Sequence, residues 1–386
     1  MARGSSDILI IGCGIIGLAI GRRLAREGLK IIIVERHACG RGASWAGAGV
    51  LAPPNPHRKD PAATLHLRSL ASYPTFCDEL LDETGIDPEY DRCGELEIAF
   101  DDAGLSSLRS DADAAGGRRM ADGRLAYEMH DAVETGRVAP LVSTAAIGSM
   151  ECREAAQVRN PRLLQALLAS CRKAGVDIRE GTPVRDFWLD GDRVTGVRSD
   201  AGDLTGGQVV LCAGAWSSQI GARLQGLMPV QPVRGQMVLL KLDRRPFATI
   251  ISRGKTYLVP RRDGHVLLGA TEEPDAGFLI RNTAKGIAGL FEKGLKLVPS
   301  LADAPIEATW AGLRPGTPDD LPYIGPVPSM PGLIAATGHF RSGLSLAPAT
   351  AEVIASIIVD DRPYNLDLAC CLPGRIFSER RGTTGS

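Results

Sequence analysis

The sequence predicts an α/β fold, α+β overall, that is organised in more than one domain. Three observations lead to this prediction. The chain has 386 residues, and at roughly 150 residues per domain this length suggests two or three domains. Residues 8–35 run strand, glycine turn, helix and strand, and residues 332–358 repeat the strand, glycine turn and helix far along the chain. Such units are typical of sheets whose strands are parallel.

The N-terminal unit begins with the apolar strand 8–11, which the motif G-x-G-x-x-G follows at residues 12–17. An amphipathic helix is expected up to about residue 27, where the next residue is a glycine that favours a helix end. A second apolar strand spans residues 29–34, and Glu35 stands at its carboxyl end. Strand, glycine turn, helix, strand and acid together form the fingerprint of a Rossmann-like dinucleotide site.

Each residue type in this fingerprint has a physical task. Gly12 makes the tight turn, Gly14 lets the backbone approach a pyrophosphate, and Gly17 allows the helix to pack closely on the strand. The helix N-terminus offers amide donors and a positive dipole end to phosphates. Glu35 is expected to take the ribose hydroxyls of an adenosine, and its charge would repel the 2′-phosphate of NADP.

The rest of the chain favours FAD over NAD. An NAD-binding domain continues as a run of strand and helix units, whereas residues 40–53 are small and glycine-rich and suit close passage along an extended ligand. A helix over 160–175 and strands within 176–189 follow, and a later strand ends in a turn at Gly214 that would approach the same ligand; a surface β-meander is the alternative. The unit at 332–358 suits the flavin end, because a helix N-terminus can stabilise negative charge on a reduced ring.

Four further stretches complete the pattern: "WAGAGVLAP", "VVLCAGAWS", "WAGLRPGTPDDLPYIGP" and "GHFRSGLSLAPAT". Together with residues 8–35 they resemble the D-amino-acid oxidase-like flavoproteins, in order from about residue 7 to 360, and within them the members that oxidise glycine to an imine for thiamine synthesis. The resemblance implies a Rossmann-like FAD-binding domain of glutathione-reductase type and a second, antiparallel-sheet substrate domain. The implied FAD-binding domain is discontinuous (1–85, 146–225 and 306–365), as is the substrate domain (86–145 and 226–305), and 366–386 form a loosely ordered tail.

The resemblance also implies which residues meet FAD beyond the glycine motif. Those expected contacts are Ile15, Ile16, Glu35, Arg36, Ala43, Ser44, Ala48, Gly49, Val50, Val184, His339, Phe340, Arg341, Ser342, Gly343, Leu344 and Ser345. Related sarcosine oxidases tether the flavin through a cysteine after this region, and "RPGTPDDLPYIGP" contains none. FAD is therefore expected to be bound noncovalently.

Oxidation of an amine beside a carboxylate requires the carboxylate to be held, and the planar fork of arginine matches a carboxylate in two places. Arg314 in "GLRPGT" and Arg341 in "GHFRSG" are the candidates, although loop arginines are often only solvated. By resemblance Arg314 is the carboxylate clamp, Arg341 lies near substrate and flavin, and Tyr257 offers its hydroxyl to the carboxylate rather than packing on a sheet. His339 could be read as a base, but the resemblance favours a backbone role, because hydride transfer in the family needs no side-chain base.

Composition excludes several other functions. The net charge is −1 with no long run of one sign, which argues against nucleic acid or an anionic membrane as partner. No run approaches 18 apolar residues, so no membrane span is expected. Nine cysteines without any C-x-x-C pair indicate reduced thiols and no metal site. A cytoplasmic protein is expected, and family precedent suggests a homotetramer.

The identity of the substrate stays open among glycine, sarcosine and small D-amino acids. Lys255, Glu272 and Glu273 bring charge to the flanks of the expected pocket, where charged side chains usually form a solvated rim, and Trp45 could narrow the site. The main hypothesis is an oxidase that reduces O₂ to hydrogen peroxide and releases glyoxylate or another 2-oxo acid and ammonia. A dehydrogenase that uses a quinone or carrier, a flavin-binding protein without turnover and an NAD dehydrogenase are the alternatives.

Overall fold

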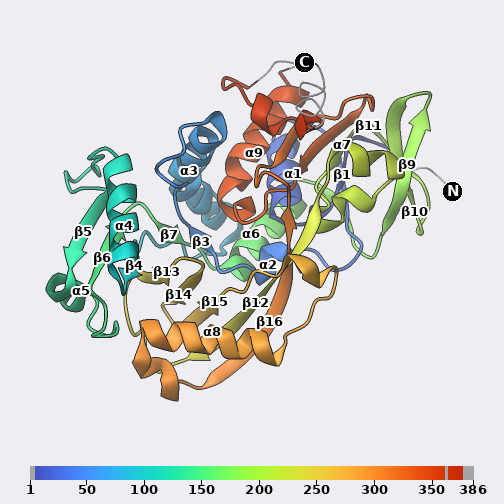
Figure 1. The fold of residues 1–386 in the computed structure, drawn as a ribbon. Coiled ribbons are helices and arrows are strands. Elements are labelled where there is room, and N and C mark those ends of the chain that lie inside the picture. The colour runs from blue at the N-terminus through green and yellow to red at the C-terminus, as the bar shows by residue number, and fades with distance from the viewer. Residues whose placement is uncertain (1–4, 361–363, 377–386) are drawn as a thin grey trace, which may run out of the picture.

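Two eight-stranded sheets organise the chain, of which the computed structural model describes residues 5–360 and 364–376. In Figure 1 the N-terminal and C-terminal helices α1 and α9 lie together, and the strands β12 to β16 of the second sheet lie below them. Both sheets recruit segments that are far apart in the sequence. The α/β fold class with a second, antiparallel-rich sheet is therefore confirmed.

The first sheet is mainly parallel and contains the N-terminal unit. β1 pairs in parallel with β2 and β11, and β11 pairs in parallel with β18. Its strands are β1 (Ser5–Ile11), β2 (Ile31–Val34), β8 (Asp177–Arg179), β9 (Val184–Asp190), β10 (Arg193–Ser199), β11 (Leu204–Leu211), β17 (Tyr323–Pro326) and β18 (Leu333–Thr337). The helices α1 (Ile15–Ala25), α3 (Pro61–Thr84), α6 (Asn160–Lys173) and α9 (Gly343–Ile358) contribute to one apolar core with alternate residues of β1.

The four consecutive apolar residues of β1, 8–11, are buried on both faces of the first sheet. Ile8 and Ile10 pack into the core beneath the helices, whereas Leu9 and Ile11 pack into a second core on the opposite face of the sheet. Side chains alternate between faces along a strand, so a continuous apolar run is stable only where both faces are covered. The predicted unit at residues 8–35 is confirmed as β1, α1 and β2.

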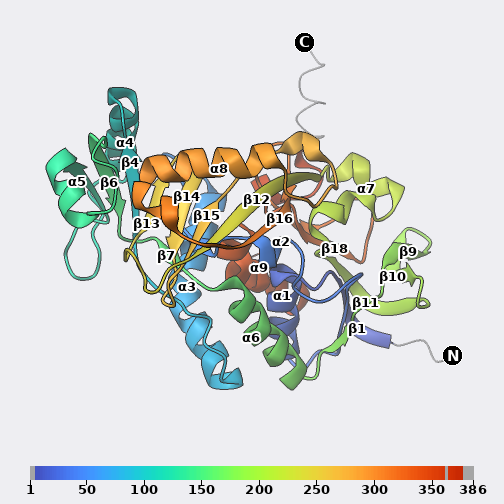
Figure 2. The ribbon, with the colours of Figure 1, turned by 90° about the horizontal axis from the view of Figure 1, so that it is seen from below.

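The second sheet is antiparallel apart from the parallel pair β4–β13. Its order is β16-β12-β15-β14-β13-β4-β6-β5. The strands are β4 (Glu95–Ala99), β5 (Tyr127–Asp131), β6 (Gly148–Cys152), β12 (Gln231–Lys241), β13 (Ile250–Arg253), β14 (Thr256–Pro260), β15 (His265–Gly269) and β16 (Ile306–Gly316). The helix α8 (Ala284–Leu297) covers one face of this sheet (Figure 2). The opposite face is free to line the space between the two sheets.

Short elements fill the connections. They are α2 (Ala43–Ala46), β3 (Val50–Leu51), α4 (Asp102–Ala114), α5 (Ala132–Val138), β7 (Ala156–Gln157), α7 (Ala222–Leu227), η1 (Gly214–Gln219), η2 (Pro274–Ala276), η3 (Pro299–Asp303) and η4 (Ala369–Cys371). Two strands that we grouped with the FAD-binding domain from the sequence, β6 and β16, hydrogen-bond within the second sheet. The division into domains otherwise stays a prediction.

The segment predicted as a loosely ordered tail is packed as far as residue 376. Cys371 is fully buried, and the Nε of Arg375 lies 2.8 Å from the Oδ2 of Asp319. The prediction of loose order is therefore wrong for residues 366–376, because this segment buries apolar and charged side chains against the first sheet. The remainder of the predicted tail, 377–386, lies outside the described residues. Among the described residues no helix is long and apolar enough to cross a membrane.

Candidate active site

A large cavity of about 1080 Å³ lies where the carboxyl ends of β1, β2, β11 and β18 face the second sheet. Ligands of open parallel sheets bind at this edge. The cavity brings together the predicted cofactor and substrate residues from across the whole chain. Those on its walls are Gly12, Gly14, Ile15, Ile16, Glu35, Arg36, Ala43, Ser44, Ala48, Gly49, Val50, Val184, Gly214, Tyr257, Arg314, His339, Phe340, Arg341, Ser342, Gly343, Leu344 and Ser345.

Gly17 is the one predicted cofactor residue that lies behind the cavity wall. A Cβ added there would lie 2.0 Å from the carbonyl oxygen of Gly12, so only glycine allows α1 to approach the turn this closely. Gly12 itself has φ +109°, and its Cβ would lie 2.4 Å from the carbonyl oxygen of Cys212. These two positions have the geometry that the dinucleotide fingerprint requires of its glycines.

The N-terminus of α1 points donors at the cavity. Its N-cap residue, Gly14, makes no side-chain capping bond, and the amide of Ile15 donates to the Oγ of Ser44 at 3.0 Å. Ser44 thus takes one amide of the first turn, and the N-terminus of the helix attracts anions through its amides and dipole. This arrangement fits the pyrophosphate of a dinucleotide.

Glu35, which the sequence predicts to meet the adenosine ribose, lines the cavity at the end of β2. Its carboxylate accepts hydrogen bonds from the backbone amides of Cys13 at 2.9 Å and His37 at 3.1 Å, which fix its position on the wall. The neighbouring Arg36 guanidinium stacks 3.3 Å from the ring centroid of Trp216, and burial lowers the pKa of Arg36. Trp216 lies in η1 after Gly214, and sequence reasoning did not assign it to the site.

A buried arginine that sequence reasoning missed holds the glycine-rich segment in place. Arg261, only 6% exposed, donates to the carbonyl oxygens of Ala48 at 2.7 Å and Val158 at 2.8 Å. Gly49 between them has φ +78°, and a Cβ there would lie 2.0 Å from the Val158 oxygen. Burial lowers the pKa of Arg261 to about 10. The signal for this residue was a charged side chain directly after the apolar strand "TYLVP".

The turn after β18 places His339 with its side chain directed into the protein. Its Nε2 lies 3.1 Å from the Oγ1 of Thr350 on α9, and the residue is 3% exposed. Burial lowers the pKa of His339 to about 3. The buried imidazole is therefore a weak base, and its ring nitrogen is bonded to α9, which favours the predicted backbone role over that of a catalytic base.

This histidine gives a prediction about stability. Unfolded histidine titrates near ~6.5, so above that pH both states are neutral, and below it the unfolded chain binds a proton that folded His339 refuses. The free energy of unfolding should therefore fall between pH 6.5 and 5, by roughly 1.4 kcal/mol per pH unit for one such histidine. Urea unfolding at pH 7.5 and 5.5 measures this loss.

His339→Gln should reduce the acid-induced loss, whereas His57→Asn should leave it in place. The side chain of His57 is 51% exposed and lies 3.2 Å from the Oδ1 of Asp111, so it lacks the burial that acts on His339. Burial also lowers the pKa of His66 to about 4, so some acid sensitivity should persist in H339Q. An unchanged pH slope in H339Q would show that His339 is not buried as a neutral group.

Arg314 and Tyr257 lie close together on the cavity side of the second sheet. The Nη1 of Arg314 donates to the carbonyl oxygen of Thr271 at 3.0 Å, and a Cβ at Gly235 would lie 2.4 Å from that nitrogen. Gly235 thus leaves room for the guanidinium. Burial raises the pKa of the Tyr257 hydroxyl, against the opposing effect of Arg314. A neutral hydroxyl beside a fixed guanidinium is suited to binding a carboxylate.

Arg341 belongs to a charged trio on the same wall. Its Nε and Nη2 lie 2.8 and 2.5 Å from the Oε2 of Glu272, and the Nζ of Lys255 lies 2.5 Å from Oε1. Both residues line the cavity; the side chain of Lys255 is 66% exposed, as expected of a solvated rim, whereas that of Glu272 is only 20% exposed. The segment after β15 pairs with β12 through Thr271 and Glu273, and Glu272 between them meets Lys255 and Arg341.

Glu273 and Trp45 do not take part in this wall. Glu273 pairs instead with Arg234, whose side chain is 8% exposed, at 2.5 Å. The ring of Trp45 packs 5.5 Å from that of Trp310. The expectation that Trp45 narrows the site is therefore not supported by its position. Two polar residues that sequence reasoning missed, His66 and Glu95, line the cavity.

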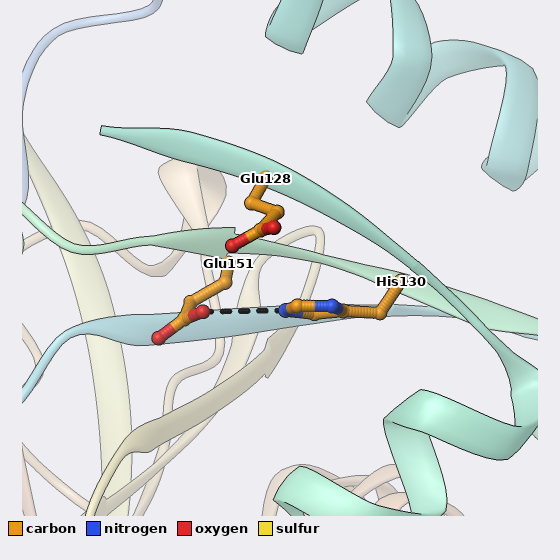
Figure 3. A group of neighbouring side chains, drawn as sticks. All are labelled: Glu128, His130 and Glu151. Atoms are coloured by element: carbon orange, nitrogen blue, oxygen red, sulfur yellow. Dashed lines mark hydrogen bonds and ion pairs between the residues drawn. The ribbon is translucent and has the colours of Figure 1, made fainter. Parts of the chain in front are cut away.

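A separate group of possible metal ligands, none of which lines the cavity, lies on β5 and β6. Glu128, His130 and Glu151 point toward one another (Figure 3), with ligand atoms within 4.8 Å. Arg153, however, lies 2.5 Å from Glu128 and 2.6 Å from Glu151, so a cation already bridges both carboxylates. A divalent ion would have to displace this guanidinium, and the group is better described as a partly exposed ion-pair network.

Fold and site together define a dinucleotide-binding protein, since the glycine turn, Glu35 and the two arginines line one cavity at the carboxyl ends of the parallel strands. Residues 7–357 match the model of the FAD dependent oxidoreductase family. The chain belongs to this family and is an FAD-dependent enzyme. Its glycine turn and the N-terminus of α1, both on the cavity wall, fit that cofactor.

Individual relatives agree with this assignment. The chain is 40% identical over 372 residues to glycine oxidase of Pseudomonas aeruginosa, covering 93% of this chain and 98% of the relative. It is 34% identical to the bifunctional protein ThiO/ThiG of Trichormus variabilis, covering 92% of this chain and 53% of that protein. The crystal structure of glycine oxidase from Geobacillus kaustophilus matches with a TM-score of 0.90 and 30% identity, over 96% of this chain and 98% of that chain.

Proposed function

We propose that this protein is an oxidase of glycine and related small amines, with sarcosine and small D-amino acids as further substrates. The observation that carries the proposal is that Arg314, Tyr257 and Arg341 share one cavity with the residues of the dinucleotide fingerprint. The similarity to glycine oxidases over nearly the whole chain supports it. The products would be hydrogen peroxide, ammonia and glyoxylate, or another 2-oxo acid.

In this proposal the residues of the chain position the substrate. Arg314 holds the carboxylate with its fork, and the Tyr257 hydroxyl donates a further hydrogen bond to it. Bound FAD supplies the acceptor for the hydride that leaves Cα. Because His339 is bonded to Thr350, the proton that the amine must lose passes to solvent before the amine enters, rather than to this side chain.

Several finer points belong to the same proposal. FAD is bound noncovalently, and the imine product supplies the thiazole of thiamine, in keeping with the ThiO/ThiG relative. The protein acts in the cytoplasm, as a homotetramer by family resemblance. The alternative is a D-amino-acid dehydrogenase of the same fold, which would pass electrons to a quinone or carrier instead of O₂.

Anaerobic mixing of the FAD-loaded protein with glycine, sarcosine and D-alanine tests the proposal. Glycine should bleach the flavin absorbance, and air should restore it rapidly with release of peroxide. Slow recovery in air, with rapid recovery on adding a quinone, would favour the dehydrogenase. A flavin that none of the three amines bleaches would contradict the proposed substrates.

A further inference from the structure

We propose that Glu272 determines substrate specificity by acting as an internal carboxylate that excludes amines with a second acidic group. This inference rests on the proposed function, because it concerns which amines the cavity admits. The trio Lys255, Glu272 and Arg341 contains two cations and one anion on the wall beside Arg314 and Tyr257. Within the protein, the carboxylate of Glu272 pairs with both cations.

The chain links this trio directly to the carboxylate site. Thr271 accepts the bond from Arg314, and the next residue, Glu272, accepts the bonds from Arg341. Consecutive Cα atoms lie ~3.8 Å apart, so adjacent residues anchor the two guanidiniums. Lys255 lies in the turn between β13 and β14, two positions before Tyr257, and both residues line the cavity. The carboxylate clamp and the cations of the trio are thus anchored by neighbouring residues on one wall of the cavity.

Glu272 satisfies the second of these centres. Burial disfavours its charge, but the hydrogen bonds from Lys255 and Arg341 outweigh burial and lower its pKa. Its side chain is 20% exposed, against 66% for Lys255 and 46% for Arg341. Asp320 approaches Arg341 only at 3.8 Å and is itself 60% exposed, so solvent screens it. Glu272 is therefore the main counter-charge of Arg341.

A substrate with one carboxylate uses Arg314 and does not disturb the trio. A second carboxylate would have to displace Glu272 from Arg341 and Lys255, or lie beside an anion. Both cost free energy, because like charges at close range repel and a displaced carboxylate would lose its charge-assisted bonds. Specificity of this kind depends on a repulsive element as much as on attractive contacts.

The test uses two ligands that cannot be oxidised at an amine and differ by one carboxylate, diglycolate and methoxyacetate. Isothermal titration calorimetry on the FAD-loaded protein measures both dissociation constants. Glu272→Gln keeps the shape of the side chain and leaves two uncompensated cations. It should tighten diglycolate binding by about tenfold or more, and methoxyacetate binding by less than about threefold.

A double variant separates charge from packing. Lys255→Met added to E272Q restores the original net charge of the trio, so it should remove most of the gain for diglycolate. Equal shifts for both ligands, or no shift for diglycolate in a folded E272Q protein, would overturn the proposal. Because neither ligand is turned over, these results do not depend on glycine oxidation, and a failure of the proposed function would appear separately in the bleaching experiment.

Discussion

Arg314→Ala is expected to lower kcat/KM for glycine by about 10³-fold. Two charge-assisted hydrogen bonds to a carboxylate, at ~1.5–3 kcal/mol each, are lost together. Arg314→Lys keeps the charge but not the planar fork, and should still lose about 10²-fold. Steady-state peroxide production measures both variants.

The matched control is an arginine outside the cavity. Arg109 is exposed on α4, and Arg109→Ala should leave kcat/KM within about twofold of the parent protein. Arg314 also donates to the Thr271 carbonyl, so the melting temperature and FAD content of R314A must be measured to exclude a change in folding. A folded, FAD-loaded R314A protein with unaltered kcat/KM would show that the substrate carboxylate is held elsewhere.

Sequence patterns predicted those parts of the site in which neighbouring residues act together. The turn from Gly12 to Gly17 and the strand–turn–helix unit around His339 are each continuous in the chain. In both, local backbone preferences fix the structure, because glycine spacing and apolar periodicity act over a few residues. The resemblance then supplied Arg314 and Tyr257, and both line the cavity.

The contacts that sequence patterns did not predict join distant segments. Glu272 and Arg341 are 69 positions apart, and Arg261 and Ala48 are 213 apart. These pairs exist because the two sheets face one another, and neither apolar periodicity nor turn chemistry records which sheet faces meet. For the same reason the sequence predicts a solvated rim position for Glu272. Only the fold shows that Glu272 has two cationic partners, Lys255 and Arg341, from distant parts of the chain.

A substitution in the glycine turn between β1 and α1 is expected to have the largest effect on FAD affinity. Gly12→Ala should cost about 3–5 kcal/mol of folding free energy, since the alanine would adopt φ +109° with its Cβ 2.4 Å from a backbone oxygen. The backbone must shift to relieve this contact, and the amides that face the pyrophosphate shift with it. We expect the dissociation constant for FAD to rise by about 100-fold or more.

Gly28→Ala provides the matched control for backbone strain. Gly28 also has a positive φ, +81°, but an added Cβ would meet nothing within 4 Å. The cost should therefore be about 1 kcal/mol, with FAD content unaltered. Flavin absorbance of the purified proteins and thermal melts with added FAD distinguish the two variants. Both variants share the backbone strain of an alanine at positive φ, but only G12A places a Cβ against the Cys212 backbone. Equal FAD content in G12A and G28A would therefore mean that the turn between β1 and α1 does not hold the cofactor.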